Sequence, residues 1–101
     1  MLLAVDVGNS NIVMGGYRGE ELCFSTRMAT EHLLEADQYA VQLSGIMRLY
    51  GVANEPVSAV VMSSVVPQLT PVLLEALRHF SGSEPHMLTV EDAAAARYRN
   101  E

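Results

Sequence analysis

The sequence has little that would connect it with nucleic acids, membranes or an oxidising compartment. It contains no lysine and six arginines against twelve aspartates and glutamates, so its formal net charge is −6. Nucleic acids and anionic membrane surfaces are bound through basic residues, and this charge therefore argues against both partners. No apolar run approaches the length that spans a bilayer, and the apolar N-terminus meets Asp6 without a basic leader or a cleavage site. We expect a cytoplasmic protein that binds neither nucleic acid nor membrane.

Cysteine and histidine are also scarce. Cys23 is the one cysteine, so no internal disulfide can form and nothing marks an oxidising compartment. A single cysteine in an apolar stretch is most often a small core residue. His32, His79 and His86 are scattered, without the spacing of a metal site. These two residue types therefore indicate neither a nucleophile nor a metal cluster.

The hydrophobic pattern predicts one α/β domain. Half of the 101 residues are hydrophobic, which is enough for a core. Valine-rich or alternating runs predict strands, and apolar residues at helical spacing predict helices. Strands are predicted at residues 2–7, 12–17, 21–28 and 86–90, and a further strand within the apolar stretch 57–66 that ends near residues 63–64; helices are predicted at residues 36–50, 70–80 and 91–99. Three strands joined by hairpins, followed by crossovers through helices, predict a mixed five-stranded, ribonuclease-H-like sheet with helices packed on it.

Three of these elements carry more specific predictions. The first strand is apolar almost throughout, which is typical of a strand buried on both faces. Leu22, Phe24 and Thr26 alternate with smaller or more polar neighbours, so we expect them to share one face of the third strand. Thr70 followed by Pro71 predicts an N-cap and a proline in the first turn of a helix.

The segment most suggestive of chemistry is Asp6-Val7-Gly8-Asn9-Ser10-Asn11, where the first predicted strand turns into the second. A carboxylate at a strand end can hold a hydrated magnesium ion. A glycine lets the backbone approach an anion closely, and small polar residues offer amide hydrogens and a hydroxyl to phosphate oxygens. No lysine follows, so the segment is not a Walker loop. On spacing alone, a tight hairpin with Asp6 near its edge explains the pattern equally well.

Three segments resemble the type III pantothenate kinases, members of the superfamily of acetate and sugar kinases, actin and heat-shock ATPases. Residues 3–11, Leu-Ala-Val-Asp-Val-Gly-Asn-Ser-Asn, resemble the family's first phosphate motif. Residues 36–39 resemble its Ala-Asp-Glu-Tyr segment, with Gln38 in place of the glutamate. Residues 63–70, Ser-Ser-Val-Val-Pro-Gln-Leu-Thr, resemble its Ser-Ser-Val-Val-Pro-x-Leu-Thr segment. The three segments stand in the family's order, and the resemblance covers roughly residues 1–90.

The resemblance implies a site for the phosphates of ATP. Asp6 would organise magnesium near those phosphates. Gly8, Asn9, Ser10 and Asn11 would line the phosphate tail. Ser10 stands where the family more often has threonine, and the hydroxyl is kept.

Four other residues have an open role. Arg27 lies where the family also tends to carry arginine, which implies a phosphate or subunit contact, and a solvated strand arginine is the alternative. Ser63 and Ser64 fall at the carboxyl end of the predicted fourth strand, a usual ligand position in open α/β sheets. Simple hydrogen bonding at a strand end is their alternative role. Asp37 is expected to favour the start of a helix.

The resemblance also implies what lies outside these residues. Family members have two such domains, hold ATP in the cleft between them and carry their catalytic aspartate in a Gly-Ala-Asp-Arg motif. No Gly-x-Asp-Arg occurs in this sequence. We therefore expect residues 1–101 to be the N-terminal, phosphate-binding half of a two-domain kinase, with its catalytic aspartate, adenosine loop and monovalent-cation site beyond residue 101. Such a chain alone would be inactive.

Three functions compete. The resemblance implies ATP-dependent phosphorylation of pantothenate to phosphopantothenate, the first step towards coenzyme A, with magnesium and with potassium or ammonium, by a homodimer. The alternative is a non-catalytic relative that acts as a binding or regulatory accessory domain. A ribonuclease-H-like nuclease is disfavoured, because it needs several carboxylates around two metals and the predicted fourth strand ends in Ser63 and Ser64 instead.

Overall fold

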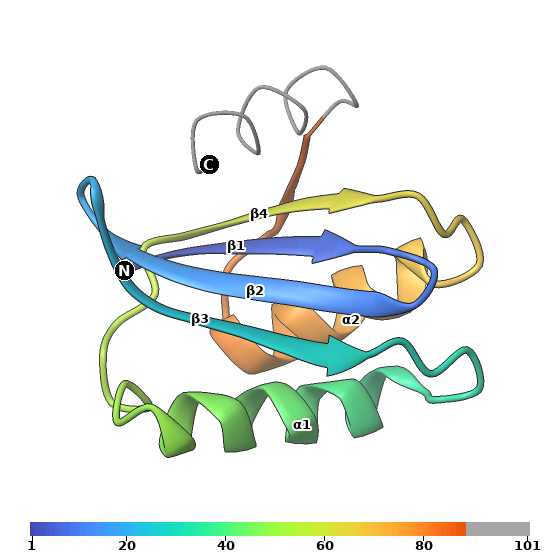
Figure 1. The fold of residues 1–101 in the computed structure, drawn as a ribbon, viewed down its shortest axis with the longest axis horizontal. Helices are drawn as coiled ribbons and strands as arrows, with labels where there is room; N and C mark the ends of the chain where they lie inside the picture. The colour runs from blue at the N-terminus through green and yellow to red at the C-terminus, as the bar shows by residue number, and fades with distance from the viewer. Residues whose placement is uncertain (89–101) are drawn as a thin grey trace.

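The computed structural model describes residues 1–88 and confirms the predicted α/β class. Its elements are β1 (Leu2–Val7), β2 (Asn11–Arg18), β3 (Glu21–Ala29), α1 (Ala36–Leu49), β4 (Ala59–Ser64), α2 (Thr70–Ser81) and β5 (His86–Met87). The strands form one mixed sheet in the order β3-β2-β1-β4-β5, as Figure 1 shows for the four longer strands. The predicted helix at residues 91–99 and the end of the predicted fifth strand lie outside the described residues.

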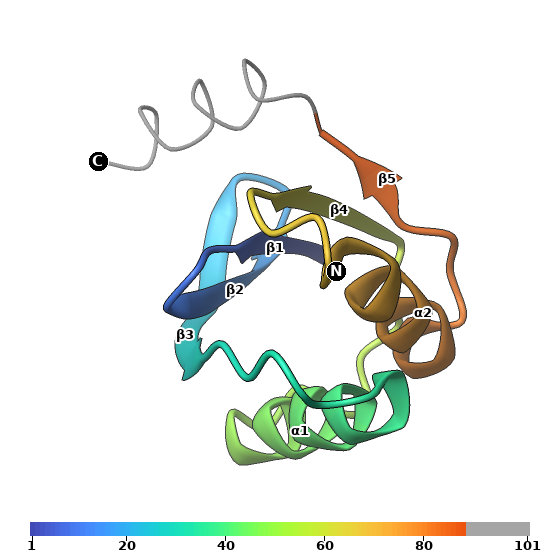
Figure 2. The same ribbon diagram turned by 90° about the vertical axis from the view of Figure 1, so that its right-hand side faces the viewer.

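Both helices pack on the same face of the sheet (Figure 2). The core lies between the sheet and the two helices. It is formed by alternate residues of the strands together with apolar residues of α1 and α2, among them Leu3, Val5, Val7, Tyr39, Leu43, Leu73 and Leu77. The prediction that the first strand is buried on both faces is wrong. Its burial alternates, with Leu2, Ala4 and Asp6 half-buried on the face opposite the helices. No helix within residues 1–88 is long and apolar enough to cross a membrane.

A β-bulge explains a second difference from the sequence prediction. Phe24 is buried and pairs with Gly16, whereas Leu22 is exposed and pairs with Tyr17, because the register shifts between Gly16 and Tyr17. The extra residue in β3 moves Leu22 away from the face that holds Phe24. A side chain on Gly16 would place its Cβ 2.3 Å from the Phe24 ring, so the ring packs directly on the backbone of β2.

The helix ends follow local hydrogen bonding. At the start of α1 the Glu35 amide donates to the Gln38 side-chain oxygen at 2.8 Å, and the chain leaves the helix at Gly51 with φ of 73°. The prediction that Thr70 is an N-cap is wrong by one residue. Leu69 is the N-cap of α2, and the Thr70 hydroxyl lies within hydrogen-bond distance of the Val66 carbonyl oxygen, at 3.2 Å, and of the Ser64 hydroxyl, at 2.9 Å.

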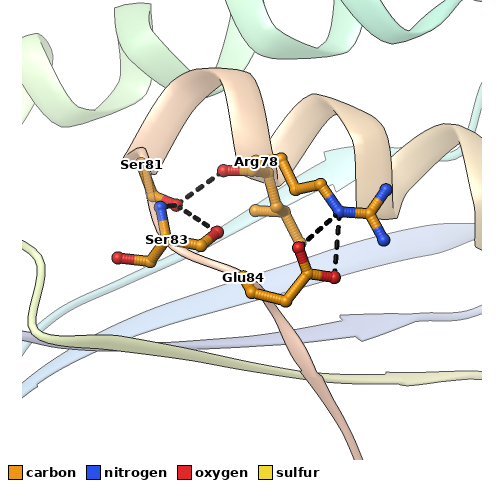
Figure 3. A network of polar contacts seen from close by, with 5 residues as sticks. Arg78, Ser81, Ser83 and Glu84 are labelled. Carbon is orange, nitrogen blue, oxygen red and sulfur yellow. Dashed lines mark hydrogen bonds and ion pairs between the residues drawn. The ribbon is translucent and has the colours of Figure 1, made fainter.

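A polar network closes the carboxyl end of α2 and leads the chain towards β5 (Figure 3). The Ser81 hydroxyl donates to the Leu77 carbonyl at 2.6 Å and accepts from the Ser83 amide at 3.1 Å. Arg78 donates to both carboxylate oxygens of Glu84, and this hydrogen bonding lowers the pKa of the Glu84 carboxyl. Both charged side chains are exposed, so the network serves mainly to direct the chain.

We predict opposite effects of alanine at two glycines. Gly16→Ala forces the Phe24 ring away and should lower the free energy of unfolding by about 1–3 kcal/mol. Gly45→Ala is the control: Gly45 is exposed inside α1 with open space at its Cβ, so alanine should stabilise by up to about 1 kcal/mol. Urea denaturation of the two variants measures both effects. Equal stability of Gly16→Ala and the parent chain would contradict the packing described for Phe24.

Candidate functional site

The parallel pairing of β1 and β4 brings two polar side chains together at their carboxyl ends. Asp6 and Ser63 are register partners, although 57 residues separate them in sequence. The Ser63 hydroxyl donates to Asp6 Oδ1 at 2.8 Å. Ser63 is buried and Asp6 is half-buried, on the face of the sheet opposite α1 and α2. The hydrogen bond therefore fixes the direction of a carboxylate that solvent still reaches.

The turn between β1 and β2 follows Asp6 directly. Its ends are joined by a hydrogen bond from the Gly8 amide to the Asn11 carbonyl at 2.9 Å. A Cβ on Gly8 would lie 3.0 Å from that same carbonyl oxygen, so the turn needs glycine for space and not for a left-handed backbone. Asn9, Ser10 and Asn11 are exposed. The turn thus presents its small polar residues to solvent beside the Asp6 carboxylate.

The segment after β3 returns to this turn, and sequence reasoning missed it. The Thr30 amide donates to the Ser10 carbonyl at 2.9 Å, and the Thr30 hydroxyl donates to the Gly8 carbonyl at 2.8 Å. His32 Nε2 lies 3.3 Å from the Asn9 carbonyl oxygen. The available signal was topological: β3 runs antiparallel to β2, so its end must return beside the start of β2 and the turn before it.

Tyr39, near the start of α1, forms hydrogen bonds to the same segment after β3. Its hydroxyl accepts from the Glu31 amide at 2.9 Å and donates to the Glu31 carbonyl at 2.5 Å. The side chain is fully buried, and burial is the main cause that raises the pKa of the Tyr39 hydroxyl. The hydroxyl therefore stays protonated at neutral pH and keeps its ability to donate.

The structure places the other residues whose role is open, Arg27, Ser64 and Asp37, in three different surroundings. Arg27 is exposed on β3 opposite Val13, and Val13 is opposite Asp6, so Arg27 stands in the cross-strand row of Asp6 with one strand between them. Ser64 bonds within its own turn, to the backbone of Val66, and not to Asp6. Asp37 is exposed in the first turn of α1, where a carboxylate favours the helix start.

The arrangement suits an anion held together with a hard cation. Residues 1–88 contain no group of three or more histidine, cysteine, aspartate or glutamate side chains that could hold a metal. A single carboxylate fits magnesium, which is usually bound by one or two carboxylates plus water and substrate phosphates. The exposed turn offers amide hydrogens and the Ser10 hydroxyl as partners for phosphate oxygens.

A separate hollow of about 500 Å³ lies at the other end of the sheet. Met47, Arg48, Pro56 and Phe80 contribute to its lining. The Pro56 carbonyl accepts from the amino group of Met1, so this end is the start of β1 and not its carboxyl end. None of the residues predicted for the site lines the hollow.

The comparisons with known proteins agree on one family. The family model described as type III pantothenate kinase matches residues 2–101. The type III pantothenate kinase of Geobacter sulfurreducens is 41% identical over 85 residues, which are 84% of this chain and 33% of that protein. The corresponding protein of Moorella thermoacetica is 41% identical over 85 residues, covering 84% of this chain and 34% of its own. That of Finegoldia magna is 35% identical over 85 residues, covering 84% and 32%. The chain spans about a third of the length of these curated relatives.

We predict that Asp6 and Ser63 are energetically coupled. In a double-mutant cycle with Asp6→Ala and Ser63→Ala, the coupling free energy should be about 1–2 kcal/mol, the range for a hydrogen bond to a partly solvated charged group. Ser64→Ala is the matched control, because within residues 1–88 the Ser64 hydroxyl bonds to Val66 and Thr70 and not to Asp6. Equal coupling of Asp6 to both serines, measured by denaturation, would contradict the assignment of Ser63.

Proposed function

Because this chain belongs to the type III pantothenate kinase family, we propose that it supplies the ATP-phosphate site of an enzyme that converts pantothenate to phosphopantothenate. This proposal rests on one observation: Asp6, Ser63 and the turn 8–11 lie together at the carboxyl ends of β1 and β4. Ligands of open α/β sheets commonly bind at this end of the strands.

Each part of the site has a role in phosphoryl transfer. The amide hydrogens of residues 9–11 and the Ser10 hydroxyl bind phosphate oxygens of ATP. Asp6, whose carboxylate accepts a hydrogen bond from Ser63, would hold a magnesium ion beside the phosphates. A bound magnesium ion supplies charge neutralisation at the β- and γ-phosphates, where negative charge must be stabilised during transfer. Asp6 and the turn would therefore hold the phosphates of ATP at this edge of the sheet.

A second domain is expected to complete the site. This chain spans about a third of its relatives and contains no Gly-x-Asp-Arg, so the aspartate that takes the proton from the pantothenate hydroxyl is assigned to a part of the kinase beyond residue 101.

Arg27 is a candidate for a further phosphate contact. It stands in the row of Asp6 two strands away, about 10 Å between backbones, which is within the combined reach of a long side chain and a triphosphate. A potassium or ammonium site and a homodimer are proposals that rest on the family resemblance alone, and a cytoplasmic location is a proposal that rests on the sequence composition.

We predict that Asp6→Asn abolishes most of the kinase activity while the protein stays folded. Loss of the carboxylate removes the proposed magnesium position, and pantothenate-dependent ATP consumption should fall about a hundredfold or more. The assay uses the whole protein that contains this chain. It is repeated in a chimera in which residues 1–88 replace the matching segment of the Geobacter sulfurreducens relative.

Glu20→Gln is the control for charge. Glu20 is exposed in the hairpin turn between β2 and β3, remote from Asp6, and its loss should leave activity unchanged. Parental turnover in the Asp6→Asn protein would remove Asp6 from the mechanism. Nucleotide binding without turnover, in both the whole protein and the chimera, would favour the alternative function of a non-catalytic accessory domain.

A further inference from the structure

Two carbonyls of the turn are held by one residue. The Thr30 hydroxyl binds the Gly8 carbonyl and the Thr30 amide binds the Ser10 carbonyl, at 2.8 and 2.9 Å. In a planar trans peptide the carbonyl and the following N–H point in opposite directions, and no peptide bond among the described residues is cis. Fixing the carbonyls of Gly8 and Ser10 therefore aims the amide hydrogens of Asn9 and Asn11 away from Thr30.

The holding segment is itself anchored to the core. Tyr39 binds both the amide and the carbonyl of Glu31 through one hydroxyl, and its ring is fully buried in α1. Glu31 is the immediate neighbour of Thr30. A continuous path of hydrogen bonds and one peptide link therefore runs from the buried face of α1 to the turn.

We propose that Thr30 and Tyr39 are positioning residues, which hold the turn 8–11 so that the amide hydrogens of Asn9 and Asn11 are presented to the phosphates of ATP. This inference rests on the proposed function of the same site. In this proposal the Tyr39 hydroxyl supports ATP binding, whereas the Tyr39 ring packs in the hydrophobic core. Preorganised donors of this kind bind an anion without a cost of reorientation.

The test compares Thr30→Val with Thr30→Ser in the whole protein. Valine keeps the shape and the backbone bond to Ser10 but loses the hydroxyl bond to Gly8, whereas serine keeps both. We expect Thr30→Val to raise the KM for ATP and the Kd of magnesium-ATP about tenfold, the effect of about one misplaced hydrogen bond to a charged group. The KM for pantothenate should not change, and Thr30→Ser should restore the parental values.

Tyr39→Phe and Thr26→Val complete the experiment. Tyr39→Phe removes both hydrogen bonds to Glu31 while keeping the ring. It should therefore also raise the KM for ATP and the Kd of magnesium-ATP. Thr26→Val is the matched control, because Thr26 lies on β3 opposite Met14, away from the turn, and should leave ATP binding unchanged.

The outcomes separate this inference from the proposed function. Lower thermal stability in Thr30→Val and Tyr39→Phe with an unchanged Kd for magnesium-ATP would overturn the positioning role, even while Asp6→Asn remains inactive. If Thr30→Val does not fold, Tyr39→Phe and Thr30→Ser still decide the question by the same Kd measurement. If Asp6→Asn retains full activity, the proposed function fails first, and the inference fails with it.

Discussion

The parallel pairing of β1 with β4 at the centre of the sheet is the constraint on which the site depends. Its register places Ser63 beside Asp6, 57 residues away in sequence. Immediately after β4, the Val65 amide also donates a hydrogen bond to the Val7 carbonyl at 3.0 Å. A shift of one residue would turn Ser63 to the helix-covered face and place either Met62 or Ser64 opposite Asp6. The apolar residues of the opposite face fix that register, so the core also determines the chemistry of the site.

The hairpin strands add the second half of the arrangement. Because β1, β2 and β3 are antiparallel neighbours, the end of β3 returns to the turn between β1 and β2. Thr30 binds that turn there, and Tyr39 links the same segment to α1. The helices thus stabilise the sheet on one face and, through a single buried hydroxyl, also support the polar edge where the strands end.

Sequence patterns were sufficient for the element order and for the turn, but not for contacts that depend on register. The valine-rich run before Ser63 and the helical spacing of Tyr39, Leu43 and Met47 predicted a strand and a helix that the structure confirms. The prediction that Leu22 shares a face with Phe24 is wrong, because a β-bulge interrupts the alternation of faces without leaving a mark in the sequence. Ser63 and Ser64 are equivalent as sequence, and the pairing with β1 alone separates them. Tyr39 looked like core because its ring is core, while its hydroxyl reaches a backbone eight residues away.

The most direct test of the central claim is a titration of the isotope-labelled chain with magnesium-ATP, followed through its backbone amide resonances. At 101 residues the chain is well suited to this measurement. The account predicts saturable shifts at residues 8–11 and at Asp6 that require magnesium. Saturable shifts confined to the hollow lined by Met47 and Phe80, with none at residues 8–11, would contradict it.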